Sequence, residues 1–313
     1  MIENPFLPFL KKQTALILDG GLATTLEDRG FDLDDDLWSA RILLENPEAI
    51  ARVHRNFLEA GADCITTATY QATFPGLEKR GLDEDQAGAL MDMAVDLALS
   101  ACQDFWFQPK NRAGRQRPLV AASVGPYGAF LADGSEYSGQ YGIGQKELRN
   151  FHRGRWDVLA ASGADLLACE TLPNLEEAQV LLDLLHKTPE RWAWFSFSCR
   201  NGSSLCDGTP FARAVELCAE SPQVAAVGVN CTAPEFISPL LDICRKVTDI
   251  PLIVYPNSGE IFDPGTRSWI NAPDHPGIPE LAAEWVKQGA AAIGGCCRTS
   301  PRVIRKLRRH LLD

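Results

Sequence analysis

Residues 225–231 read Ala225-Ala226-Val227-Gly228-Val229-Asn230-Cys231, an apolar run that ends in an amide and a thiol. Such a run, without polar alternation, is typical of a parallel strand that is buried on both faces. Seven further runs of this kind occur along the chain: Thr14–Gly21, Cys64–Tyr70, Pro118–Gly125, Asp165–Thr171, Trp192–Cys199, Pro251–Pro256 and Ala290–Gly295. The sequence therefore predicts eight buried strands.

Amphipathic segments separate these runs. Asn46-Pro47-Glu48 opens the first, with a capping residue followed by proline at the first helical position. The others are Glu84–Phe107, Gln145–Ser162, Leu175–His186, Pro210–Ala219, Pro234–Val247, Pro279–Gln288 and Pro301–Leu311. Eight strand–helix pairs without a low-complexity linker predict one domain over residues 1–313, a (β/α)8 barrel. A doubly wound parallel sheet is the structural alternative.

The charge balance restricts the partners. The 313 residues include 30 Lys and Arg against 41 Asp and Glu, a net charge of −11, which disfavours nucleic acid and anionic membranes. No apolar stretch is long enough to span a membrane, and the amino terminus does not resemble a signal peptide. Ten cysteines in a chain of this length do not suggest a secreted disulfide framework. We therefore expect a cytoplasmic protein whose cysteines are free thiols or metal ligands.

Three thiols fall at strand ends, where barrel enzymes build their active sites. Cys231 ends the sixth run, and Cys296-Cys297 follow the eighth. Adjacent residues of a regular strand point to opposite faces, so both of the paired cysteines can face one site only if the chain bends, as Gly294-Gly295 permits. Zinc prefers sulfur and nitrogen ligands, and three protein ligands leave one position open for chemistry. The trio thus indicates a catalytic zinc centre.

Alternatives to this centre remain. The cysteines could be buried free thiols, and Cys199 at the end of the fifth run is a rival ligand. None of the five histidines falls at a predicted strand end, which disfavours a zinc hydrolase with an activated water. A structural zinc is disfavoured because no CxxC pair occurs. A zinc-storage or redox-sensing protein would bind metal or form a disulfide without turnover.

Three thiolates make a poor Lewis acid but a good site for a substrate thiol. A free thiol of pKa near 8.5 is only about 3% ionised at pH 7, and coordination would favour the thiolate by roughly 2 kcal/mol. Thiol alkylation is the chemistry that results. Asp19 and Glu170, at the ends of the first and fourth runs, fit a substrate with an ammonium group. Asp19 could instead cap the Gly20-Gly21 turn, and Glu170 could pair with an arginine.

In this combination the chain resembles the homocysteine S-methyltransferase family over nearly its whole length. The motifs that carry the resemblance are Leu18-Asp19-Gly20-Gly21, Leu37-Trp38-Ser39-Ala40, Thr69-Tyr70-Gln71-Ala72, Gly125-Pro126-Tyr127-Gly128, Asp133-Gly134-Ser135-Glu136-Tyr137, Glu170-Thr171, Gly228-Val229-Asn230-Cys231, Tyr255-Pro256-Asn257-Ser258-Gly259-Glu260 and Gly294-Gly295-Cys296-Cys297. The loops after the third and seventh runs are most similar to those of the bacterial and plant enzymes that use S-methylmethionine.

The resemblance implies a (β/α)8 barrel with zinc on Cys231, Cys296 and Cys297. It implies that homocysteine binds zinc through sulfur, with its amino group near Glu170, in a pocket that includes Asp19, Gly20 and Thr67. We expect methyl transfer from a sulfonium, S-methylmethionine or S-adenosylmethionine, to form methionine. Betaine or a folate as donor and selenocysteine as acceptor are alternatives. We expect a monomer. The aromatic and acidic loop residues Tyr127, Tyr137, Tyr141 and Glu260 are expected to stabilise the cationic donor, with ordinary surface positions as the alternative for each. Asn230, Asn257 and Trp38 are further expected substrate contacts, and Trp38 could instead simply pack.

Overall fold

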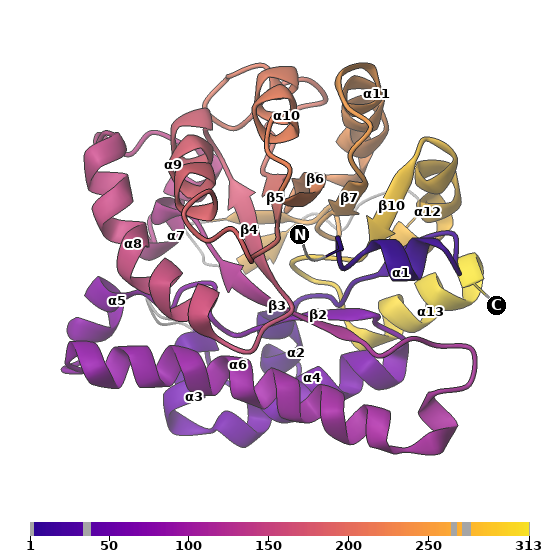
Figure 1. The fold of residues 1–313 in the computed structure, drawn as a ribbon, viewed down its shortest axis with the longest axis horizontal. Coiled ribbons are helices and arrows are strands. Elements are labelled where there is room, and N and C mark those ends of the chain that lie inside the picture. Colours follow the sequence, from indigo (N-terminus) through magenta and orange to yellow (C-terminus); the bar gives the residue numbers. More distant parts are fainter. Residues whose placement is uncertain (1–2, 34–38, 264–267, 271–276, 313) are drawn as a thin grey trace.

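The computed structural model describes residues 3–33, 39–263, 268–270 and 277–312. Within these residues eight strands form one parallel sheet of order β1-β10-β7-β6-β5-β4-β3-β2. Leu18 bridges Cys64 in parallel next to β1 and β2, and the Asp19 amide donates to the Cys64 carbonyl across 3.0 Å, so the two ends of the sheet meet. The predicted (β/α)8 barrel is confirmed (Figure 1). The strands are β1 (Leu16–Ile17), β2 (Cys64–Thr66), β3 (Leu119–Val124), β4 (Leu166–Leu172), β5 (Ala193–Phe197), β6 (Val224–Asn230), β7 (Leu252–Tyr255) and β10 (Ala290–Ile293).

Helices cover the outer face of the sheet (Figure 1). Asn46 caps the first long helix by accepting from the Ala49 amide, and Asp83 and Gln86 form a capping box on α6. No described helix is long and apolar enough to cross a membrane. These covering helices lie close to their predicted bounds: α4 (Pro47–Ala60), α6 (Glu84–Phe107), α8 (Gln145–Ala161), α9 (Leu175–Leu185), α10 (Phe211–Ala219), α11 (Ile237–Val247), α12 (Ile278–Lys287) and α13 (Pro301–Leu312).

Short elements inside the connections were not predicted. Most lie in segments that follow a strand, at the end of the barrel where the cysteines gather. They are α1 (Leu7–Leu10), α2 (Leu22–Glu27), α3 (Ser39–Glu45), α5 (Phe74–Glu78), α7 (Tyr127–Leu131), the 3-10 turns η1 (Pro109–Asn111), η2 (Ser135–Tyr137) and η3 (Pro234–Phe236), and the antiparallel pair β8 (Ile261–Asp263) and β9 (Ser268–Ile270). That the chain is a single domain stays a prediction.

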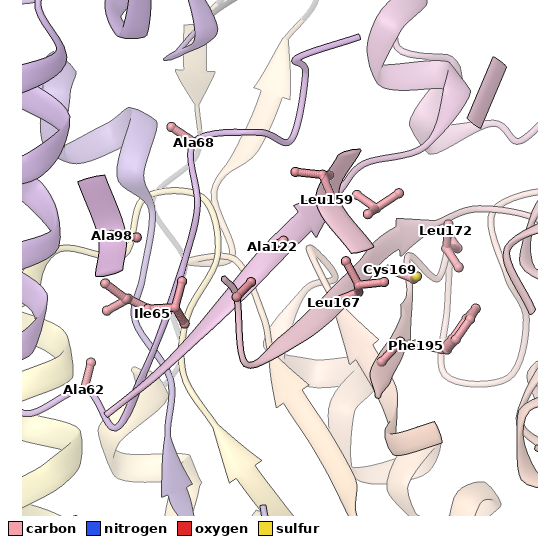
Figure 2. Packing of buried hydrophobic residues seen from close by; sticks show 14 of the residues in the cluster. Ala62, Ile65, Ala68, Ala98, Ala122, Leu159, Leu167, Cys169, Leu172 and Phe195 are labelled. Atoms are coloured by element: carbon pink, nitrogen blue, oxygen red, sulfur yellow. The ribbon is translucent and has the colours of Figure 1, made fainter. Parts of the chain in front are cut away.

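The outer core lies between the strands and the helices. Figure 2 shows Ile65 of β2, Ala122 of β3 and Leu167 of β4 on the side of the sheet where Ala98 of α6 and Leu159 of α8 pack. All five are at most 1% exposed. Burial of a leucine or isoleucine side chain stabilises the fold by about 1.5–3 kcal/mol, and the alanines allow α6 to approach the sheet closely.

The barrel interior forms a second core from the alternate residues of the same strands. Leu166, whose neighbour Leu167 faces the helices, packs here with Trp194 and Ile253. Phe6, just before α1, lies with its ring centroid 6.1 Å from that of Trp194, and the Asn4 amide donates to the Ala225 carbonyl at the start of β6. The segment around α1 therefore closes the amino-terminal end of the barrel and leaves the carboxyl end for a site.

Candidate metal and substrate site

The three thiols predicted as ligands converge at the carboxyl end of the barrel. Cys231 follows β6, and Cys296 and Cys297 follow β10. The Cys231 and Cys297 sulfurs are 3.7 Å apart, and all three sulfurs lie within 4.8 Å of one another. Zinc–sulfur bonds of about 2.3 Å in a tetrahedron place ligand sulfurs about 3.8 Å apart. The spacing fits a soft metal ion, and no other such triplet of His, Cys, Asp or Glu occurs among the described residues.

The backbone turns sharply where the thiols are presented. β10 ends at Ile293, so Cys296 and Cys297 lie beyond the regular strand, in accord with the bend expected at Gly294-Gly295. A Cβ on Gly294 would lie 2.5 Å from the Leu18 Cβ, so only glycine fits there. Cys231 itself has a positive φ of 47°. Thr171 and Arg298, which follow Glu170 and Cys297, also have positive φ, 61° and 63°.

The protonation of the trio also fits a cation. Hydrogen bonds from the Cys296 and Cys297 thiols hold the pKa of Cys231 well below its usual range, and the same sharing holds the pKa values of both donors high. Thiols this close ionise together only when a positive charge lies among them. The Asn230 amide supports the cluster, since its Nδ2 lies 3.9 Å from the Cys296 sulfur and donates to Thr171 Oγ1 across 2.8 Å.

Two buried carboxylates lie beside the thiols. Asp19 Oδ2 accepts from the Thr66 amide at 2.8 Å, and Glu170 accepts from the Ser123 hydroxyl and, at 3.0 Å, from the Tyr255 hydroxyl. Burial raises the pKa of Asp19 to about 8 and that of Glu170 to about 7. Neither forms an ion pair with a described Lys, Arg or His, so the predicted alternative of an arginine partner for Glu170 is not observed there. Such carboxylates favour a cationic ligand.

Gly20 and Thr67 shape the same cavity. A Cβ on Gly20 would lie 2.5 Å from the Thr299 carbonyl oxygen. Only glycine therefore lets the segment after β1 lie this close to the segment after β10. Thr67 Oγ1 accepts from the Ser123 amide at 3.0 Å and lies 2.6 Å from Thr69 Oγ1. The Thr67 hydroxyl is therefore held in place by its contacts with Ser123 and Thr69.

The cavity brings together Asp19, Gly20, Thr67, Glu170 and the three thiols. Tyr137, expected from its loop position, also lines it, with its hydroxyl 3.4 Å from the Cys231 sulfur. Lining residues that sequence reasoning did not select are Leu18, Gly21, Leu22, Ala23, Thr24, Thr66, Ala68, Tyr70, Gln71, Ser123, Glu136, Thr171, Trp194, Tyr255 and Gly295. Several of these residues belong to the sequence motifs that carry the family resemblance. Those motifs were the signal that could have identified them as lining residues.

Tyr127 and Tyr141 lie outside this cavity, in a buried polar network. The Tyr127 amide and the Tyr141 hydroxyl donate to the two oxygens of Glu177, at 2.6 and 2.8 Å. Glu177 also lies 2.7 Å from His152, whose other ring nitrogen is 2.9 Å from Arg155. The network therefore ties the loop after β3 to helices α8 and α9, and the tyrosines serve as its anchors.

The remaining candidates lie around the trio rather than in the cavity lining. Glu260 pairs with Arg298 at 2.8 Å, and Asn257 accepts from the Gly259 amide within its own turn. Asn230 contacts the Cys296 sulfur through its side-chain amide. Trp38 is outside the described residues. Cys199, the rival ligand, is buried and does not belong to the metal-binding triplet.

Fold and site together define a (β/α)8-barrel protein with a trithiol centre and an acidic pocket at the carboxyl rim. The model of the family described as homocysteine S-methyltransferase matches residues 16–311. The chain therefore belongs to the homocysteine S-methyltransferase family, a family of methyltransferase enzymes.

Individual relatives match this chain over most of their lengths. The chain is 47% identical to the homocysteine S-methyltransferase YbgG of Bacillus subtilis, covering 97% of this chain and 96% of the relative. It is 44% identical to a selenocysteine Se-methyltransferase of Brassica oleracea, covering 95% and 89%. The crystal structure of the metallated form of the homocysteine methyltransferase MmuM from Escherichia coli superposes with a TM-score of 0.87 at 46% identity, covering 97% of this chain and 99% of that one.

Proposed function

We propose that this protein transfers a methyl group from a sulfonium donor, foremost S-methylmethionine, to the thiol of homocysteine, and so forms methionine. The observation that carries the proposal is one cavity that holds three mutually close thiols and two buried carboxylates without a described cationic partner. Thiols suit a soft metal and a sulfur substrate, and the carboxylates suit an ammonium group.

Cys231, Cys296 and Cys297 would hold zinc. Bound there, zinc would offer an open position at which a substrate thiol is kept as the thiolate at neutral pH. The Asn230 amide, aimed at the Cys296 sulfur, would orient that ligand and reduce its charge.

Asp19 and Glu170 would bind the ammonium group of homocysteine. A cation restores the ionised form of buried carboxyl groups whose pKa values lie near 8 and 7, so binding of the ammonium and ionisation of the carboxyls reinforce each other. The Ser123 and Tyr255 hydroxyls fix the direction of Glu170. The acceptor is thereby held at both its sulfur and its nitrogen.

The transfer needs alignment more than acid–base chemistry. The homocysteine sulfur forms a bond to the methyl carbon as the bond from that carbon to the sulfonium breaks, and the electron pair of that bond remains on the departing thioether. The thiol proton leaves when the acceptor binds. With S-methylmethionine both products are methionine, and one proton is released. The chain's role is to hold the two sulfurs in line and exclude water.

The test is methionine formation by purified protein with homocysteine and S-methylmethionine, before and after removal of metal by a chelator. We expect turnover that is lost with the metal and restored by zinc, and we expect Cys231→Ser to bind less zinc and make no methionine. Cys206→Ser is the control, because that half-buried thiol bonds to the Ser198 hydroxyl rather than joining the trio. Full activity and zinc content in Cys231→Ser would refute the proposal.

The same assay decides the donor and the acceptor. S-adenosylmethionine, betaine and a methyl folate replace the donor in separate reactions, and selenocysteine replaces the acceptor, as the Brassica relative's name suggests. We propose that the protein acts as a monomer, since the residues proposed to bind zinc and the acceptor line a single cavity at the rim of the barrel, and that it resides in the cytoplasm, where its ten cysteines would stay reduced. Light scattering and cell fractionation test these two points.

A further inference from the structure

A third carboxylate, that of Glu136, lines the cavity from the loop after β3. Its Oε2 is shielded from solvent and has no hydrogen-bond partner among the described residues. Asp19 and Glu170, by contrast, accept hydrogen bonds from Thr66 and from Ser123 and Tyr255. A carboxylate oxygen withdrawn from water without a partner is costly unless a cation or a donor reaches it. A cationic or hydrogen-bond-donating ligand could therefore supply the partner that the Glu136 carboxylate lacks.

The backbone holds Glu136 firmly in this position. η2 packs against Gly128 of α7 so closely that a Cβ there would lie 2.7 Å from the Ser135 carbonyl carbon. The Ser198 hydroxyl donates to the Glu136 carbonyl at 3.1 Å. Gly134, with φ of 85°, supplies the turn that begins η2. The loop is thus built to direct this side chain.

The surroundings of Glu136 suit a sulfonium. The next residue, Tyr137, places its hydroxyl 3.4 Å from the Cys231 sulfur, so this wall of the cavity adjoins the thiols. The ring of Tyr70 lines the same cavity. Aromatic rings attract cations to their electron-rich faces. A sulfonium cannot donate a hydrogen bond, so one carboxylate and two rings match its chemistry better than a network of polar groups.

We propose that Glu136, with Tyr70 and Tyr137, forms the subsite for the positively charged sulfur of the methyl donor. The inference rests on the proposed function and deepens it, because it divides the cavity in two. Asp19 and Glu170 face the ammonium of the acceptor, and Glu136 faces the cation of the donor. The proposal makes Glu136, rather than Glu260, the acidic residue that contacts the donor. Glu260, which was expected from the sequence to do so, already pairs with Arg298.

The test compares Glu136→Gln with Asp133→Asn. The second variant removes a charge from the same loop but keeps an oxygen that can accept from the Ser135 amide, as Asp133 does at 2.9 Å. We expect Glu136→Gln to raise the KM for S-methylmethionine at least tenfold, with the KM for homocysteine and the metal content unchanged. Asp133→Asn should stay within twofold of the parent. An unchanged donor KM in Glu136→Gln would overturn the inference.

A binding measurement separates charge recognition from a structural role. Calorimetry compares S-methylmethionine with its neutral analogue, in which a CH group replaces the sulfonium sulfur. The parent protein should prefer the cation at least tenfold, and Glu136→Gln should bind both equally. Equal binding by the parent, or a preference that survives in Glu136→Gln, would contradict the subsite. Because this readout needs no turnover, it stands apart from the methionine assay that tests the proposed function.

Discussion

The Tyr255 hydroxyl donates a hydrogen bond to Glu170 Oε2 across 3.0 Å, and the Tyr255 hydroxyl oxygen itself accepts from the Trp194 indole at 2.9 Å. This relay crosses the barrel from β7 to β4 and fixes the direction of a carboxylate that lacks a described counter-ion. We predict that Tyr255→Phe raises the KM for homocysteine about ten- to 150-fold, the equivalent of about 1.5–3 kcal/mol for a hydrogen bond to a charged group. The KM for the donor should not change. Steady-state kinetics with each substrate varied would show this, and equal losses for both substrates would contradict it.

The Glu177 network predicts a large effect on stability. Glu177 is fully buried and takes part in contacts with Tyr127, Tyr141 and His152. Glu177→Gln leaves the buried Arg155 without its nearby negative charge, and we expect a loss of about 3–5 kcal/mol in the free energy of unfolding. Glu176→Gln, one residue earlier on the exposed face of α9, should change it by less than about 0.5 kcal/mol. Urea unfolding followed by circular dichroism distinguishes them; similar midpoints would refute the structural role.

Two glycines predict opposite outcomes of the same substitution. A Cβ on Gly228 of β6 would overlap the Ile253 carbonyl oxygen of β7, so Gly228→Ala must force neighbouring strands apart. We expect at least about 3 kcal/mol of destabilisation. A Cβ on Gly88 of α6 would lie 3.8 Å from Val158, an ordinary contact, and Gly88→Ala should stabilise the protein by about 0.5–1 kcal/mol. Thermal unfolding of the two variants measures both the expected loss and the expected gain in stability.

Buried histidines predict a loss of stability in acid. His54 of α4 is fully buried, neither ring nitrogen has a described partner, and burial lowers its pKa to about 4. The folded state therefore binds fewer protons than the unfolded state below pH 6.5. Stability is complete above that value and falls as the pH drops toward 4, by about 3 kcal/mol for this one residue.

The substitution His54→Leu tests that origin. The variant should flatten the dependence of the unfolding free energy on pH between 6.5 and 4, whereas His310→Leu, at an exposed position of α13, should leave it as in the parent. Chemical denaturation at several pH values gives the slopes. An unaltered slope in His54→Leu would assign the acid sensitivity elsewhere, with His152 the next residue to test, since burial also lowers its pKa to about 4.

The sequence was sufficient for features that depend on strand ends. Cys231, Cys296 and Asp19 each follow a buried strand and Glu170 lies near the carboxyl end of β4, and parallel strands in a closed barrel carry all such positions to one rim. These rim positions could be predicted without knowing which distant segments of the chain pair with one another. The same logic gave the barrel and the bounds of the long helices.

Loop residues could not be assigned in this way. Tyr127, Tyr137 and Tyr141 occupy similar polar segments in the sequence, yet Tyr137 lies near Cys231 while the other two are held by Glu177. The difference arises from contacts made by α7, η2 and α9 after the barrel has closed. Glu136 lies in one of the family motifs, yet its role was overlooked for the same reason, because its unpartnered oxygen is a property of the packed cavity that the motif alone does not reveal.

The left-handed backbone at Thr171, Cys231 and Arg298 has a consequence for engineering. The left-handed conformation costs each of these residues about 1–2 kcal/mol of folding stability that glycine would not lose. A library selected only for heat resistance should therefore accumulate glycine or asparagine at these positions, whereas a library selected for turnover should retain the cysteine. Sequencing both populations would show where durability and catalysis make opposite demands on one barrel rim.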